Sequence, residues 1–159
     1  MRRTILVIAL VVCATAAALV YLLDPTPRIP PRHEPPSAQR ALLDATRNKS
    51  EDPDLGILFD ELNARHFGAR LPDVKAVWSS ELDTLDEGDY RLNGMTDGTT
   101  ILVKAAFKDD DTDVRRTLCH EMAHVKLIAG GQMSTAHDSV FQRELRRIFD
   151  EGCFPRIWA

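Results

Sequence analysis

The chain has 159 residues, 44% of them hydrophobic, with 24 acidic and 20 basic side chains, and this length allows one small domain. From residue 51 to the end there are 21 acidic and 13 basic residues, so this part has a net charge of about −8 with histidine neutral. Basic side chains that neutralise phosphates supply much of the affinity for nucleic acid. The charge therefore argues against a nucleic acid as the partner.

The N-terminal segment, residues 4–23, contains no charged side chain and follows the basic start Met1-Arg2-Arg3. Its length suits a hydrocarbon core about 30 Å thick, so we predict that residues 1–23 are an uncleaved anchor in the lipid bilayer. A cleaved signal sequence is the alternative, because Ala14-Thr15-Ala16 has the form of a cleavage site. The two arginines favour a cytoplasmic N-terminus, which places the rest of the chain outside the cytoplasm, in a periplasm.

A proline-rich linker is predicted for residues 24–50, with a short helix possible around Ala38–Arg47. Six prolines in its first half favour extended conformations, so this half is expected to act as a semi-rigid spacer. The globular domain is expected to cover residues 51–159.

The first part of that domain predicts one helix and three short strands. Apolar residues recur at helical spacing in Asp52–Phe67, and an alternating pattern in Val74–Trp78 is typical of a strand. Two more strands are predicted at Tyr90–Leu92 and Thr99–Val103. Turns are expected at Asn93-Gly94 and Asp97-Gly98.

Two helices follow, at Asp113–Ala129 and Ser139–Glu151. The acidic run Asp109–Asp113 is expected to cap the first of them rather than to bind metal. In the second, one face is predicted to carry Phe141, Leu145, Ile148 and Phe149 into the core. The order of elements predicts an α+β domain with a small antiparallel or mixed sheet.

The soluble part has two cysteines, Cys119 and Cys153, and no C-x-x-C pair, which excludes a zinc ribbon. We expect Cys119 to be a small core residue of its helix. A disulfide between the two cysteines is the alternative, and it would require an oxidising compartment.

The segment that indicates a function is His120-Glu121-Met122-Ala123-His124, within the longest predicted helix. Residues four apart share a helix face, so His120 and His124 can bind one zinc ion. Glu121 can then take a proton from a water on that ion, which is the chemistry of a metallopeptidase. Of the other histidines, His33 and His66 are expected to be solvated.

A third zinc ligand is needed, and two residues are candidates. His137 follows the Gly130-Gly131 break and lies four residues before Phe141, so it can share the core-facing side of the last helix. Glu144 lies among arginines that offer it solvated ion pairs. We therefore favour His137. No residue that would stabilise an oxyanion is identified, and Tyr90 is expected to pack at the sheet edge.

Several segments together resemble the SprT-like, Spartan-type metallopeptidase domain over residues 55–150. The resemblance implies a minigluzincin-like zincin core, zinc held by His120, His124 and His137, and Glu121 as catalytic acid/base. It also implies structural roles for five other side chains. The matching segments are Phe59-Asp60-Glu61-Leu62-Asn63, His66-Phe67-Gly68-Ala69-Arg70-Leu71-Pro72, Val77-Trp78-Ser79, the His120–His124 motif and Ala136-His137-Asp138-Ser139-Val140-Phe141. The structural residues are Phe59, Asn63, Phe67, Leu71 and Trp78.

The sequence thus predicts a membrane-tethered, extracytoplasmic zinc endopeptidase that acts on proteins or peptides. Two alternatives stay open. One is a cytoplasm-facing, DNA-associated protease of the same family, and the other is a non-catalytic module in which zinc stabilises the fold.

Overall fold

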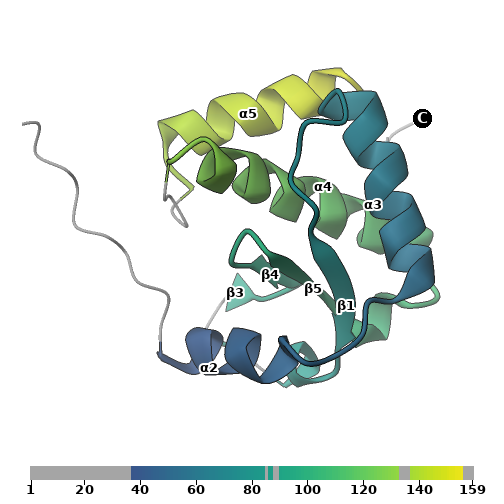
Figure 1. Cartoon of the computed structure of the whole chain (residues 1–159), viewed down its shortest axis with the longest axis vertical. Helices are drawn as coiled ribbons and strands as arrows, with labels where there is room; N and C mark the ends of the chain where they lie inside the picture. The colour runs from purple at the N-terminus through teal and green to yellow at the C-terminus, as the bar shows by residue number, and fades with distance from the viewer. Residues whose placement is uncertain (1–36, 85, 88–89, 133–136, 156–159) are drawn as a thin grey trace, which may run out of the picture. The chain divides into compact units, whose positions relative to one another are not determined.

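The computed structural model describes residues 37–84, 86–87, 90–132 and 137–155 (Figure 1). The predicted membrane segment, the proline-rich half of the linker and His33 lie outside these residues. Within the described ranges, no helix combines the length and the apolar character that a bilayer crossing requires.

The described chain is an α+β domain, as predicted. It contains four α-helices, two 3-10 turns and five short strands. The helices are α2 (Ser37–Thr46), α3 (Pro53–His66), α4 (Asp111–Ala129) and α5 (Ser139–Asp150). The strands are β1 (Lys75–Ser79), β2 (Asp86–Glu87), β3 (Tyr90–Arg91), β4 (Gly94–Thr96) and β5 (Thr100–Lys104), and the 3-10 turns are η1 (Glu81–Asp83) and η2 (Ala105–Phe107).

The main sheet has three strands in the order β1-β5-β4. Strand β5 pairs in parallel with β1, with Val77 opposite Leu102, and antiparallel with β4, with Met95 opposite Leu102. The sheet is therefore mixed, which was one of the two predicted forms. The crossover from β1 to β5 leaves β4 at an edge of this sheet.

The second predicted strand is confirmed as a strand, but it lies outside the main sheet. Tyr90 and Arg91 form β3, which pairs only with β2 in a separate hairpin, and β4 takes the expected position in the main sheet. The predicted turn at Asn93-Gly94 was wrong for the same reason, because Gly94 begins β4. The turn at Asp97-Gly98 is confirmed: Gly98 has a φ of +89° and the Asp97 carboxylate accepts hydrogen bonds from the Thr99 and Thr100 amides.

Aspartates cap three of the helices and fix where they begin. Asp52 and Asp138 accept amide hydrogen bonds at the starts of α3 and α5. Asp110 accepts from the amides of Thr112 and Asp113 at the start of α4, so the predicted capping role of the acidic run is confirmed. The predicted helices begin and end within two residues of the observed ones.

The two faces of the sheet pack against different helices (Figure 1). One face contributes Ala76, Ile101 and Val103 to a core that it shares with α3, α4 and α5. The opposite face packs against Leu42 and Leu43 of α2, in a second cluster completed by Val77, Leu82, Met95 and Leu102. Since α2 lies inside the segment predicted as linker, the packed part of the chain begins before residue 51.

A disulfide joins Cys119 of α4 to Cys153, which follows α5, with 6.1 Å between the Cα atoms. Cys119 is buried in the core, as expected, and the alternative of a disulfide to Cys153 holds as well. Gly152, with a φ of +80°, turns the chain back after α5, and Arg115 donates a hydrogen bond of 2.8 Å to the Cys153 carbonyl. These two features bring Cys153 against α4, and neither could be foreseen from the spacing of the cysteines.

Two further predictions about exposure were wrong. His66 is only 4% exposed, because the end of α3 is covered by α5 and the segment that follows it. Phe149 is 62% exposed, although Phe141 and Ile148 of the same helix are fully buried. The inward face of α5 is therefore narrower than the apolar pattern indicated.

Candidate metal centre

The first two residues of the site come from adjacent turns of α4. His120 and His124 lie on one face of the helix, with 5.1 Å between their ring centroids. His124 is buried and His120 is half-buried. The helix alone therefore orients two imidazoles toward one point, as the spacing of four residues predicted.

His137 reaches the same point from the segment just before α5. Its Nε2 lies 3.0 Å from Nε2 of His120, and its ring centroid lies 5.3 Å from that of His124. The chain ends α4 at Gly130 and Gly131, whose φ is +77°, and Asp138 caps α5 directly after His137. The cap thus fixes the start of the helix one residue after the histidine.

The three imidazoles can hold a metal ion. Each offers a ring nitrogen, and these atoms all lie within 4.8 Å of one another. Nitrogens bound to zinc at about 2.0–2.1 Å in a tetrahedral arrangement lie a little over 3 Å apart, so small side-chain adjustments suffice. A set of three nitrogen donors is also the type that leaves a fourth position on zinc for water.

Phe141 supports all three histidine rings from α5. Its fully buried ring stacks on His124 at 4.1 Å between centroids and meets His120 and His137 at 5.0 and 4.8 Å. Its spacing from His137 predicted a shared face, but the sequence carried no signal for this contact with all three rings. Phe141 holds the imidazoles in place and excludes water from one side of the site.

The electrostatics of the site favour neutral imidazole at His120. Burial, followed by the neighbouring His124 and His137, lowers the pKa of His120 to about 4. At neutral pH this side chain is therefore uncharged, which is the state that binds metal ions.

Glu121 is buried beside the histidines, with 5% of its surface exposed. Burial raises the pKa of its carboxyl to about 8. In the described part of the chain it makes no ion pair and no hydrogen bond through its carboxylate. A carboxylate in such surroundings is an unusually strong base and destabilises the fold when it is charged.

Gly94 of β4 provides the space for Glu121. A Cβ at Gly94 would lie 2.5 Å from Cγ2 of Thr117 and 3.0 Å from Oε1 of Glu121, and both distances are too short for unstrained packing. Sequence reasoning missed this role and assigned Gly94 to a turn. A lone glycine inside a strand is the signal that could have indicated the close approach.

Glu144, the other candidate for the third ligand, lies away from this cluster. Its carboxylate forms ion pairs with Lys126 at 2.8 Å and with Arg147, as its position among basic residues predicted. The geometry therefore brings His137, and not Glu144, to His120 and His124. The backbone of Tyr90 belongs to β3, but its side chain lies outside the described part.

The residues predicted to be structural are in keeping with that role. Phe59 and Phe67 are buried in the main core, and Leu71 and Trp78 pack against it. The Asn63 side chain accepts a hydrogen bond from the Leu71 amide, which fixes the loop after α3.

Comparison with protein families places this site in a known context. The model of the SprT-like family matches residues 55–156, about two thirds of the chain. The match includes most of α3, the main sheet, α4 and α5, and so every residue of the candidate centre. Comparisons with curated proteins and with solved structures found no match.

Proposed function

Because the chain belongs to the SprT-like family, we propose that it is a zinc-dependent metallopeptidase that hydrolyses peptide bonds in protein substrates. In this proposal His120, His124 and His137 hold one zinc ion, and Glu121 is the catalytic acid/base. The observation that carries it is the convergence of three histidine nitrogens next to a buried carboxylate.

Glu121 performs the proton transfers. When bound, zinc would lower the pKa of a water on it toward about 7, and the ion would polarise the substrate carbonyl. The Glu121 carboxylate accepts the proton of the attacking water, holds it and delivers it to the departing amine. In the zinc-free protein, burial raises the pKa of this carboxyl, which makes its carboxylate a stronger base.

A non-catalytic zinc module is the weaker alternative. A buried carboxylate without an ion pair costs stability, and a site that only holds the fold together would gain nothing from it. Both Glu121 and the glycine that makes room for it instead fit a site that uses the carboxylate.

The proposal includes a tethered location outside the cytoplasm. The disulfide between Cys119 and Cys153 supports it, because disulfides persist in oxidising compartments. The uncharged run of residues 4–23 supports an anchor. The cytoplasmic, DNA-associated alternative lacks support from both the disulfide and the acidic charge. An export-dependent reporter fused after Ala159 tests the location, since activity only from a cytoplasmic reporter would refute it.

The catalytic proposal is tested by metal content and cleavage in one preparation. The purified full-length protein should contain about one zinc per chain and cleave an unfolded protein such as casein. Chelation should abolish cleavage, and added zinc should restore it. A protein that binds one zinc but cleaves no protein or peptide would favour the non-catalytic module.

A further inference from the structure

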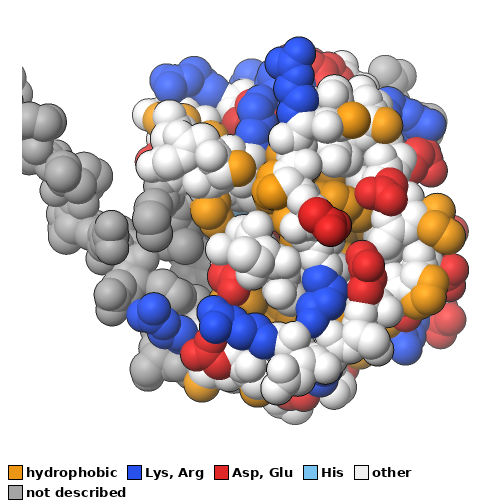
Figure 2. Space-filling view, viewed as in Figure 1, with side chains coloured by type: hydrophobic (Ala, Val, Ile, Leu, Met, Phe, Trp, Pro, Cys, Tyr) orange, Lys and Arg blue, Asp and Glu red, His pale blue; other side chains and the backbone are white. Residues whose placement is uncertain are grey.

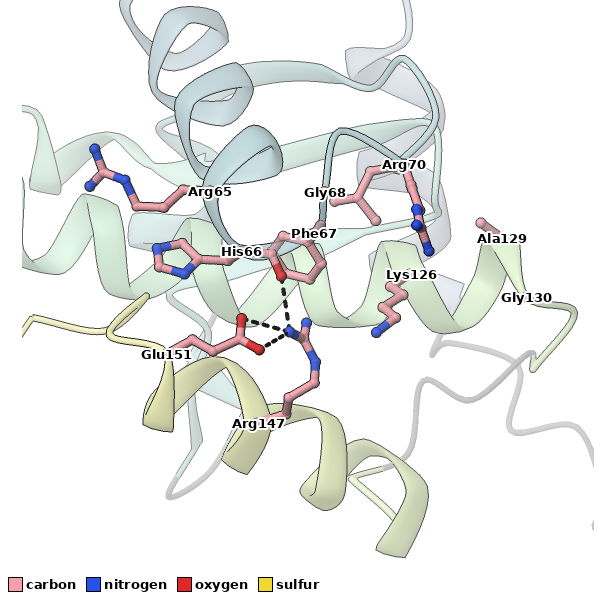
Figure 3. Close-up of a pocket in the computed structure, with 11 residues that line it drawn as sticks. Arg65, His66, Phe67, Gly68, Arg70, Lys126, Ala129, Gly130, Arg147 and Glu151 are labelled. Atoms are coloured by element: carbon pink, nitrogen blue, oxygen red, sulfur yellow. Dashed lines mark hydrogen bonds and ion pairs between the residues drawn. The ribbon is translucent and has the colours of Figure 1, made fainter.

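A recess of the domain lies between the ends of α3 and α4 and the C-terminal end of α5 (Figure 3). It is an open pocket of about 520 Å³, which we call the Arg70 pocket. Lys126 lines it from α4, two residues after His124, and two residues correspond to a rotation of about 200° around a helix. The pocket therefore lies on a different face of α4 from the metal centre.

Three cationic side chains project into this pocket. Arg70, Lys126 and Arg147 extend into the same space, whereas Arg65 points away from it (Figure 3). Lysine and arginine side chains also gather over α5 on the adjoining surface (Figure 2). In a domain whose overall charge is acidic, this is a local basic recess.

The ion pairs of these side chains leave one positive charge without a carboxylate to balance it. Lys126 and Arg147 share the carboxylate of Glu144, and Arg147 also pairs with Glu151 at 2.7 Å. Within the described residues, Arg70 forms neither an ion pair nor a side-chain hydrogen bond. Three cations therefore face two carboxylates. A single monovalent anion balances the one unpaired positive charge. A phosphate dianion or a polyphosphate carries more negative charge than this and would be repelled by the two glutamates.

The walls of the pocket add an apolar component. Phe67 and Leu71 line it, and the Phe67 ring lies 5.5 Å from the Arg147 guanidinium. A ligand with one carboxylate beside apolar groups matches both features, and an acidic side chain within a polypeptide has this composition.

We propose that the Arg70 pocket binds an acidic side chain of the polypeptide that the metal centre cleaves, as a docking site separate from the bond that is broken. This inference rests on the proposed peptidase function. Arg147 follows Phe141, which contacts the metal centre, by six residues or about 9 Å along α5. An extended peptide covers about 3.3 Å per residue, so a substrate has the reach to occupy both sites.

Binding is tested first, with two short labelled peptides, one containing a single glutamate among leucines and alanines and the other its glutamine twin. The zinc-loaded Glu121→Gln protein is used so that neither peptide is cut. The glutamate peptide should bind about two- to fivefold more tightly, as expected for one exposed charge pair. Arg70→Ala should remove this difference. Arg146→Ala should preserve it, because Arg146 is exposed on α5 and does not line the pocket.

Cleavage by the otherwise wild-type chain then separates docking from chemistry. Arg70→Ala should raise KM for the glutamate peptide and leave kcat, and both constants for the glutamine twin, unchanged. Equal binding of the two peptides, or a difference that survives Arg70→Ala, would overturn the proposal. Tighter, Arg70-dependent binding of inorganic phosphate or of a single-stranded oligonucleotide would make this a phosphate site and overturn it too. If neither peptide is cut although the binding difference holds, the peptidase function fails and the carboxylate pocket stands.

Discussion

Gly94 and Glu121 lie so close together that a Cβ at position 94 would lie 3.0 Å from Oε1 of Glu121 and press on the carboxylate. The contact joins the edge strand β4 to the helix that carries the metal-binding histidines. A single methyl group at this point would move the proposed acid/base.

The first prediction concerns Gly94→Ala. The added methyl group would meet both Thr117 and Glu121, so we expect at least a tenfold loss of kcat with zinc retained, and about 1–3 kcal/mol of lost stability. Steady-state cleavage, metal content and urea unfolding measure the three quantities. Because the shortest contact is with Cγ2 of Thr117, the added substitution Thr117→Ser should recover part of the stability. Wild-type kcat in Gly94→Ala would contradict the role of this contact.

A second prediction tests Glu121 itself. Glu121→Gln keeps the shape of the side chain but cannot accept a proton, so kcat should fall by about 10²-fold or more. Zinc content should stay near one per chain, because the histidines are unchanged. If this variant cleaves as fast as the parent, another group must be the base.

The third prediction concerns the metal ligands. His137→Ala should lower zinc affinity sharply, because it leaves two protein ligands. Glu144→Ala should leave zinc near one per chain and cost on the order of 1 kcal/mol, since it removes partly exposed ion pairs to Lys126 and Arg147. Zinc measured on both purified variants decides between the residues. Loss of zinc from Glu144→Ala alone would move the ligand set to His120, His124 and Glu144.

The fourth prediction is a pH dependence of the zinc-free protein. The folded-state pKa of Glu121 is raised to about 8, so its contribution to stability is present at low pH and is lost as the pH rises to 8. The pKa of His120 is lowered to about 4, so its contribution is lost in the opposite direction, as the pH falls from 6.5 to 4. Between pH 6.5 and 8 only the Glu121 effect remains of these two.

Urea unfolding at pH 6.5 and pH 8, with a chelator present, measures this effect. Wild type should lose on the order of 1–2 kcal/mol over the interval. Glu121→Gln should lose much less, because it has no titrating group at this position. Equal losses in the two proteins would show that the pH dependence of the unfolding free energy has another origin.

A fifth prediction concerns the disulfide. Replacing both Cys119 and Cys153 with alanine should lower the free energy of unfolding by about 2–4 kcal/mol, as expected for a closed loop of this length. A strong reductant should destabilise wild type and leave the double variant unchanged. Equal stability of oxidised wild type and the double variant would contradict the prediction.

The sequence predicted the parts of this molecule that depend on local periodicity. Helices α3, α4 and α5, the capping of α4 by its acidic run and the shared face of His120 and His124 all follow from composition and spacing along the chain. His137 could be placed near these two histidines because a glycine break lets the chain turn back toward α4. The family resemblance, confirmed by the match to the SprT-like model, indicated the same residues.

The errors arise where distant segments meet. In the sequence, Gly94 is typical of a turn, and its role becomes visible only when α4 packs against β4. His66 is typical of a solvated residue, and it is buried because α5 covers the end of α3. The pairing of Cys119 with Cys153 depends on the turn at Gly152. None of these contacts is encoded in the periodicity of one segment, because each depends on how two elements approach one another.

The disulfide also has a consequence for how the metal centre assembles. Its sequence separation of 34 residues encloses His120, Glu121, His124 and His137 in one covalent ring. Closing this ring confines His137 near α4 in the unfolded chain and so raises its effective concentration at the two helix-borne histidines. Once oxidised, the chain has less conformational entropy left to lose when it captures its metal. Oxidation of the cysteines therefore prepares the site for metallation, although neither sulfur contributes a ligand.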